Sequence, residues 1–261
     1  MVEEFLARGW TKFPAEPEVR DWAAAAFEVA RRQLHDPRER ARGLDCQGTW
    51  FVGVDALPND ATGDAGTGPL GGVALAAARA LYGQLPLHPA QVSVVWPGYP
   101  RPRRGEGEAA FGYRRRRDAA HVDGLHAVGP DRRRVLCEHH AYILGLPLTT
   151  CAAGASPLVV WERSHEVMRR AFERALGPRP EPDWADTDIT DIYKAARRQA
   201  FETCRRVPLP ARPGEACLLH RFCLHGIAPW ADGATAPPIG RMIAYFRPEF
   251  PPGRRDWLTA P

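Results

Sequence analysis

Residues 117–128 of the chain, RDAAHVDGLHAV, contain two side chains that can bind a divalent metal, His121 and Asp123, one residue apart. If the segment is extended, both project to the same side, because side chains alternate along a strand. A His-x-Asp tripeptide also arises by chance in a chain with 9 histidines. The pair therefore predicts a metal site only together with further ligands elsewhere in the chain.

A third ligand is available about a hundred residues later, in GEACLLHRFCLHGIAPW (214–230), which contains His220 and His225. Two histidines and one carboxylate form the facial triad of non-haem Fe(II) oxygenases, which leaves coordination positions free for a co-substrate and oxygen. An oxygenase that uses 2-oxoglutarate also needs a cation for the far carboxylate, and the planar fork of arginine suits it. The run GRMIAYFRP supplies Arg241 for this role, whereas Arg247 at its end is expected to form a surface ion pair.

The order of these segments resembles the phytanoyl-CoA dioxygenase-like family of Fe(II)/2-oxoglutarate oxygenases. The resemblance covers about residues 90–248 and is carried by AAHVDG, GASPLVVWERSHE, PGEACLLHRFCLHGIAPW and GRMIAYFRP. It implies His225 rather than His220 as the ligand, because Gly226 follows His225. The residues that it implies for Fe(II) are His121, Asp123 and His225, and Arg241 is the residue that it implies for 2-oxoglutarate.

The resemblance also carries expectations about the co-substrate pocket and the reaction. Tyr142 falls near the position of an aromatic pocket residue in relatives, and Thr149 and Thr150 are hydroxyl donors close by. We predict contacts to 2-oxoglutarate from Tyr142 and Thr150, since no hydroxyl stands two residues after Arg241. The carboxylate of Asp123 favours hydroxylation, because halogenating relatives have a small residue there. No catalytic side chain beyond the metal ligands is expected.

Other interpretations of the same residues stay open. One is a jelly-roll protein that binds metal without turnover. Another is a divalent-metal hydrolase with a metal-bound water as the nucleophile, which leaves Arg241 without a role. A structural zinc site is a third, but its residues lack the usual CxxC-based spacing. Those zinc candidates are Cys217, His220, Cys223 and His225.

The elements around these residues change in character along the chain. Helical periodicity predicts helices over 17–35, about 70–82, 164–177 (with Ser164 as its N-cap) and 188–205. Short apolar runs bounded by glycine and proline predict strands over 47–55, 91–100, 141–149, 156–161, 215–220 and 240–248. This order favours an α+β fold with a mainly β core, a double-stranded β-helix (jelly-roll, cupin-like) with N-terminal and inserted helices. We expect a single domain over 1–261, with helices of about 1–85 packed on the core.

Composition indicates an ordinary globular protein rather than a membrane or exported one. Hydrophobic residues make up 44% of the chain and charged residues 25%. No run of 18 residues is uninterruptedly apolar. The N-terminal MVEEFLARGW lacks the features of an export signal. We therefore expect a cytoplasmic protein with its six cysteines reduced.

The net charge of +4 is modest, and its basic residues are mostly arginine. Two arginine runs, 114–117 and 132–134, are not interleaved with aromatic residues, which argues against a nucleic-acid partner. The expected partners are molecular oxygen and a small-molecule substrate. Because the first run precedes the metal pair, we predict that it orients an anionic substrate. The loops over about 56–70, 99–117 and 180–200 are expected to shape the pocket.

Overall fold

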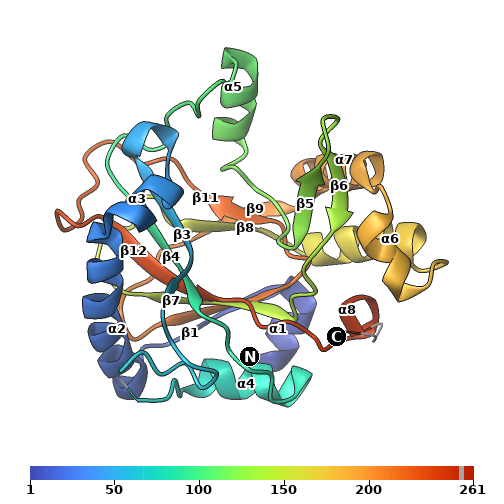
Figure 1. The fold of residues 1–261 in the computed structure, drawn as a ribbon. Helices are drawn as coiled ribbons and strands as arrows, with labels where there is room; N and C mark the ends of the chain where they lie inside the picture. The colour runs from blue at the N-terminus through green and yellow to red at the C-terminus, as the bar shows by residue number, and fades with distance from the viewer. Residues whose placement is uncertain (67, 253–255) are drawn as a thin grey trace.

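Two antiparallel sheets facing each other form the centre of the protein (Figure 1). The computed structural model describes residues 1–66, 68–252 and 256–261. In order across the larger sheet, its strands are β1 (Trp10–Phe13), β10 (Ala216–His220), β7 (Tyr142–Pro147), β12 (Arg241–Phe246), β4 (Ala90–Val95), β3 (Trp50–Leu57) and β2 (Leu44–Asp45). The smaller sheet consists of β11 (His225–Ile227), β8 (Leu158–Glu162) and β9 (Arg205–Leu209). A hairpin of β5 (Leu125–Val128) and β6 (Arg133–Leu136) stands apart. The predicted α+β class with a mainly β core is confirmed.

The strands of the larger sheet are apolar on both faces because both faces are covered. On β12, Ile243 and Tyr245 face the smaller sheet, where they join a core with Leu158 of β8. Their neighbours Met242 and Ala244 point the other way, into the core beneath the helices. Alternation of this kind is inherent to a strand, and burial on both sides explains why the sequence MIAYF is continuously apolar.

Helices cover the outer face of the larger sheet and one end of the smaller one (Figure 1). On the larger sheet, α2 (Pro17–His35) packs on β3, and α4 (Val73–Tyr82) packs on β10 and β7. Beyond the smaller sheet, α6 (Ser164–Leu176) and α7 (Thr190–Thr203) pack on each other. The other helices are α1 (Val2–Arg8), α3 (Pro37–Gly43), α5 (Glu108–Arg116), α8 (Asp256–Thr259) and the 3-10 turns Cys46–Gly48 and Glu181–Asp186. No helix in the described ranges is long and apolar enough to cross a membrane. The division into one domain stays a prediction.

Most predicted elements coincide with observed ones to within a few residues. The helix predicted over 17–35 matches α2 at both ends. The strand predicted over 47–55 begins later, at β3, because Cys46–Gly48 forms a 3-10 turn first. The strand predicted over 91–100 ends with β4, before Pro97, a residue type that cannot donate to a sheet.

Two local expectations were wrong. The segment of about 99–117 was expected to be a loop, but it contains α5. No residue of α5 is buried, so the helix has no apolar stripe that sequence periodicity could reveal. Ser164 does not cap α6. It is the first residue inside that helix, Arg163 occupies the cap position, and the Ser164 hydroxyl accepts a hydrogen bond from the backbone N–H of Leu224.

Arg221 fixes the C-terminal segment from inside the core. It is 1% exposed, and its guanidinium donates to the carbonyl oxygens of Trp257, Ala260 and Pro261 at 2.7, 2.6 and 3.1 Å. Burial lowers the pKa of Arg221 to about 10, so the side chain is charged at neutral pH. One buried cation therefore joins three backbone oxygens of this segment, and Arg169 and Tyr82 donate further bonds to those of Ala260 and Pro261.

We expect Arg221→Met to lower the free energy of unfolding by roughly 1–3 kcal/mol, because three backbone oxygens each lose a charged donor. Urea denaturation measures this change. Arg205→Met is the matched control, since Arg205 pairs with Glu162 at 2.9 Å while 69% of its side chain is exposed. An exposed pair contributes less than about 1 kcal/mol. Equal effects of the two substitutions would contradict the role given to Arg221.

Candidate metal centre

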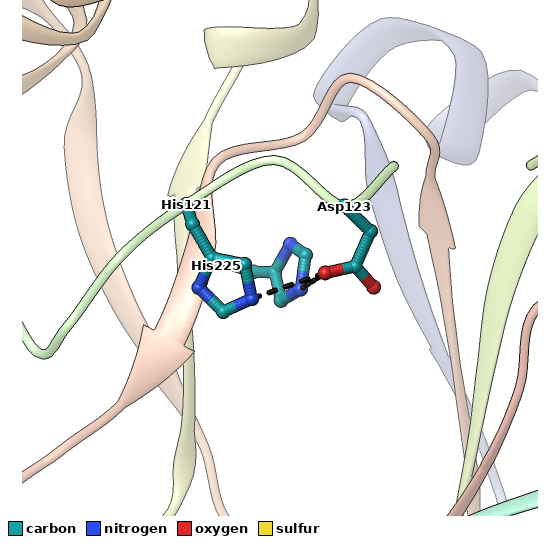
Figure 2. Close-up of side chains that lie close together, drawn as sticks. All are labelled: His121, Asp123 and His225. Carbon is teal, nitrogen blue, oxygen red and sulfur yellow. Dashed lines mark ion pairs between the residues drawn. The ribbon is translucent and has the colours of Figure 1, made fainter. Parts of the chain in front are cut away.

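The structure brings His121, Asp123 and His225 together beside the space between the two sheets (Figure 2). One ligand atom from each residue lies within 4.8 Å of the others. Asp123 Oδ1 lies 3.0 Å from Nε2 of His121 and 3.7 Å from Nε2 of His225. Metal–ligand bonds to nitrogen and oxygen are about 2.0–2.2 Å long, so these three atoms can surround one ion.

Backbone pairing sets the two histidines opposite each other. The N–H of His121 donates to the carbonyl of His225 at 2.8 Å, and the reverse bond measures 3.1 Å. Each imidazole is also oriented by its own loop: Nδ1 of His121 lies 3.1 Å from the carbonyl oxygen of Ala119, and Nδ1 of His225 lies 2.9 Å from that of Cys223. With Nδ1–H donating to a carbonyl, the lone pair of each Nε2 is left for a metal.

The glycine after His225 lets the two ligand-bearing segments approach. A Cβ on Gly226 would lie 2.1 Å from the carbonyl oxygen of Asp118 and 3.0 Å from Cα of Ala120. The N–H of Ile227 donates to that same carbonyl of Asp118 at 2.8 Å. Only glycine leaves room for the crossing, which gives the His-Gly sequence a steric reason.

Side chains from α7 and β9 hold the His-x-Asp segment from the other side. Arg206 donates two hydrogen bonds to the buried carboxylate of Asp118, at 2.6 and 2.9 Å. Tyr193 accepts a hydrogen bond at its hydroxyl from the N–H of Val122, at 3.1 Å. The inserted helix α7 therefore helps to position two of the three candidate ligands.

Asp123 is held in its charged form by the groups around it. Burial on its own raises the pKa of this carboxyl, but His225, His121 and Arg247 outweigh burial and hold the pKa well below its usual range. Burial lowers the pKa of His225, which favours the neutral, metal-binding imidazole. The expected surface ion pair of Arg247 was wrong. Its Nη1 lies 3.7 Å from Asp123 Oδ2, and both side chains are only 12% exposed.

Four alternate residues of β12 and its end share one face of the strand. Arg241, Ile243, Tyr245 and Arg247 follow one another at a spacing of two. Among the described residues, none forms a hydrogen bond of good geometry with the terminal nitrogens of Arg241, the hydroxyl of Tyr245 or Nε of Arg247, although Arg241 and Tyr245 lie close enough to interact. Burial raises the pKa of Tyr245, Arg241 lowers it and Asp123 raises it, so this hydroxyl lies within the field of both charges. Buried donors without partners mark a place for an anionic ligand.

A cavity of about 140 Å³ adjoins the three candidate ligands. Its polar lining includes the triad and Arg247, and Trp50, Ile143, Leu158 and Tyr245 contribute apolar surface to its walls. Arg241 itself borders a smaller hollow with Thr149 and Cys151. Arg241 therefore lies on the same face of β12 as Tyr245 and Arg247, next to a hollow separate from the cavity that the triad lines.

The structure does not bring Tyr142 or Thr150 into this site. Tyr142 is fully buried on the opposite face of β7, where it stacks on Tyr82 of α4, and Ile143 faces the cavity instead. Because side chains alternate, an alignment error of one residue reverses the face. Thr150 is exposed, whereas the hydroxyl of its neighbour Thr149 accepts a hydrogen bond from the N–H of Met242. Both predictions are corrected accordingly.

The alternative ligand His220 lies in a separate environment. It is fully buried, its Nε2 is 2.9 Å from Nη2 of Arg169, and its Nδ1 accepts from the N–H of Phe222. Cys217 and Cys223 form no metal-binding group with it: within the described residues, His121, Asp123 and His225 are the one such cluster. The zinc interpretation is therefore not supported.

Tyr245 is the site residue that sequence analysis missed. Its signal was present in GRMIAYFRP, because the tyrosine stands four residues after Arg241 and therefore on the same face of a strand. Arg247, two residues further, shares this face, but the proline after it suggested that the strand had already reached the surface.

Comparison with known proteins shows the fold. No family model matches the chain, and no curated protein matches it either. A solved structure of the non-heme alpha-ketoglutarate-dependent carbocyclase SnoK from nogalamycin biosynthesis matches with a TM-score of 0.50 and 15% identity, over 98% of this chain and 87% of that one. AviO1 from Streptomyces viridochromogenes matches with a TM-score of 0.50 and 17% identity, over 97% of this chain and 96% of that one. The predicted jelly-roll architecture is thereby confirmed.

We expect Gly226→Ala to weaken the affinity for a divalent metal by about 10-fold or more, a size typical of changes next to metal ligands. The added Cβ displaces residues 118–120 and with them His121. Titration with Mn(II) followed by electron paramagnetic resonance measures the affinity. Gly107→Ala is the control, because a Cβ there meets no atom within 4 Å. Unchanged Mn(II) binding in Gly226→Ala would contradict the steric argument.

Arg247→Gln tests whether the arginine positions Asp123. We expect metal affinity to fall by about 10-fold, because the outer oxygen of the carboxylate loses its partner. Removing a positive charge would by itself strengthen cation binding, so tighter Mn(II) binding would contradict the positioning role. Arg115→Gln, at an exposed position of α5, serves as the control for the loss of one charge.

Proposed function

We propose that the protein is a non-haem Fe(II)- and 2-oxoglutarate-dependent dioxygenase that hydroxylates a small organic molecule, with release of succinate and CO₂. The observation that carries this proposal is the row of buried, unpartnered donors on β12 beside a cluster of two histidines and one aspartate. A metal site alone does not need those donors, whereas a dicarboxylic co-substrate does.

The donor set of His121, Asp123 and His225 fits Fe(II). Two imidazoles and one carboxylate occupy half of an octahedral shell and leave the other positions for ligands that are not protein. The paired backbone of the two histidines fixes their rings, and Arg247 fixes the outer oxygen of Asp123. In this proposal the triad holds iron and Arg247 orients one of its ligands.

Arg241 fits the far carboxylate of 2-oxoglutarate. The side chain is 5% exposed, yet no described residue forms a hydrogen bond of good geometry with either terminal guanidinium nitrogen. Leaving charged donors buried and unpaired is costly, and a carboxylate would satisfy both nitrogens at once. The hydroxyl of Tyr245 offers a further donor along the same face.

Together, bound iron and 2-oxoglutarate would supply the oxidising chemistry of such an enzyme, with molecular oxygen as the other reactant. The chain contributes orientation and exclusion of water, through the apolar walls formed by Ile143, Leu158 and Tyr245. No additional acid or base is required. A hydrolase built on the same triad would leave Arg241 unpaired, so this observation favours the oxygenase.

The proposal also includes the family, the substrate class, the location and the type of oxidation. The motif order supports membership of the phytanoyl-CoA dioxygenase-like family. A small-molecule substrate and a cytoplasmic location remain predictions from the sequence, as does hydroxylation among the possible oxidations.

Anaerobic addition of Fe(II) and 2-oxoglutarate to metal-free protein tests the proposal. We expect a weak visible metal-to-ligand charge-transfer band in the wild type and none in His121→Ala. Arg241→Gln should retain Fe(II) affinity but weaken 2-oxoglutarate binding by roughly 10–100-fold, the size of a lost charged hydrogen bond. His126→Ala is the control, since the exposed His126 lies near Glu138 and outside the triad.

The opposite result would be equally clear. If the wild type shows no band and instead retains tightly bound zinc after purification, the oxygenase proposal fails. The hydrolase or non-catalytic interpretation would then take its place.

A further inference from the structure

A second, larger cleft opens on the outer side of the candidate metal centre. It measures about 570 Å³ and is formed by the loop before α5, α5 itself, the segment 119–122, the β5–β6 hairpin and α7. Trp50 and His121 line both this cleft and the inner cavity. A molecule in the cleft can therefore reach the metal centre past the half-exposed ring of His121.

The charge of this cleft is strongly positive. Five arginines line it but only one acidic residue does, Glu106, within the part of the chain that the structure describes. Glu106 is already used by Arg114, which donates two bonds of 2.7 Å to its carboxylate. Arg103 is paired with Asp45 at 2.8 Å. The arginines of the run 114–117 therefore differ in their surroundings: Arg114 is neutralised by Glu106, whereas Arg117 lines the cleft without a carboxylate partner among the described residues.

Three cleft arginines, Arg117, Arg134 and Arg197, form no ion pair with any described residue. All three are half-buried and fixed in place. Arg197 donates to the carbonyl of Ala120 at 2.7 Å while its Nε is buried without a partner. Arg134 donates to the carbonyl of Leu125 at 3.1 Å, and Arg117 lies over the ring of Phe201. Like charges that line one cleft, with donors unused, are suited to an anion.

We propose, on the basis of the oxygenase function above, that the substrate carries a phosphate ester that binds to Arg117, Arg134 and Arg197. The part to be oxidised then extends past Trp50 and His121 toward the metal centre. A dianionic group with three terminal oxygens matches three guanidinium groups better than a monoanionic carboxylate does. The aromatic rings of Trp50, Tyr113 and Tyr193 supply the apolar walls.

Phenyl phosphate is the probe for this site, titrated into metal-free protein by calorimetry. We expect binding that weakens with added salt and that weakens by about 10-fold in Arg134→Gln and in Arg117→Gln, each of which loses a charge-assisted contact. Arg133→Gln and Arg198→Gln are matched controls, because these exposed neighbours do not line the cleft. Benzoate should bind more weakly, and benzyl alcohol should not bind.

Several results would overturn the proposal. The proposal fails if phenyl phosphate does not bind, or if the cleft variants and the controls bind it equally well. It also fails if benzoate binds as tightly as phenyl phosphate. Loss of binding in Arg241→Gln, with the cleft variants unaffected, would place the anion at the inner arginine instead. Since the titration needs neither iron nor 2-oxoglutarate, its failure is distinguishable from failure of the charge-transfer experiment.

Discussion

The backbone contact between His121 and His225 is the constraint on which the site depends. The two residues lie about a hundred positions apart, and two mutual hydrogen bonds place them face to face. The contact forms only because Gly226 has no side chain where residues 118–120 cross β11. It lies at the edge of a sandwich whose sheets are joined by apolar packing. The core therefore determines where the strands lie, and one glycine determines whether the ligands meet.

The triad could be predicted from the sequence more completely than the residues around it. His121, Asp123 and His225 were predicted from residue type, spacing and resemblance, and the structure places them together. Tyr142 was wrong because sequence similarity located β7 but not which of its two faces carries the aromatic ring. Arg247 was misjudged for a different reason: its partner, Asp123, is remote in sequence, and only the fold brings the two together.

The outer cleft could be anticipated only in part. An arginine run before the metal pair suggested an anion, but its members have different surroundings because α5 turns them to different sides. Arg114 is neutralised by Glu106, Arg115 and Arg116 are exposed, and Arg117 faces the cleft. Its partners there, Arg134 and Arg197, come from β6 and α7, and neither stands in a recognisable motif. A charged cleft assembled from three segments has no sequence signature, whereas a His-x-Asp pair does.

Charge follows a consistent pattern across the site. Arg241 and Arg247 stand on the inner side of the triad, and on the outer side stand three arginines that form no ion pair with a described residue. The acidic residues that line the two cavities are Asp123 and Glu106, and Glu106 is already paired with Arg114. A divalent metal would add to this positive charge. Such an excess is unfavourable in a half-buried site unless anions enter from both sides. A dicarboxylate on the inner side and an anionic substrate on the outer side would balance it. The two proposals are therefore linked by electrostatics although they rest on different residues.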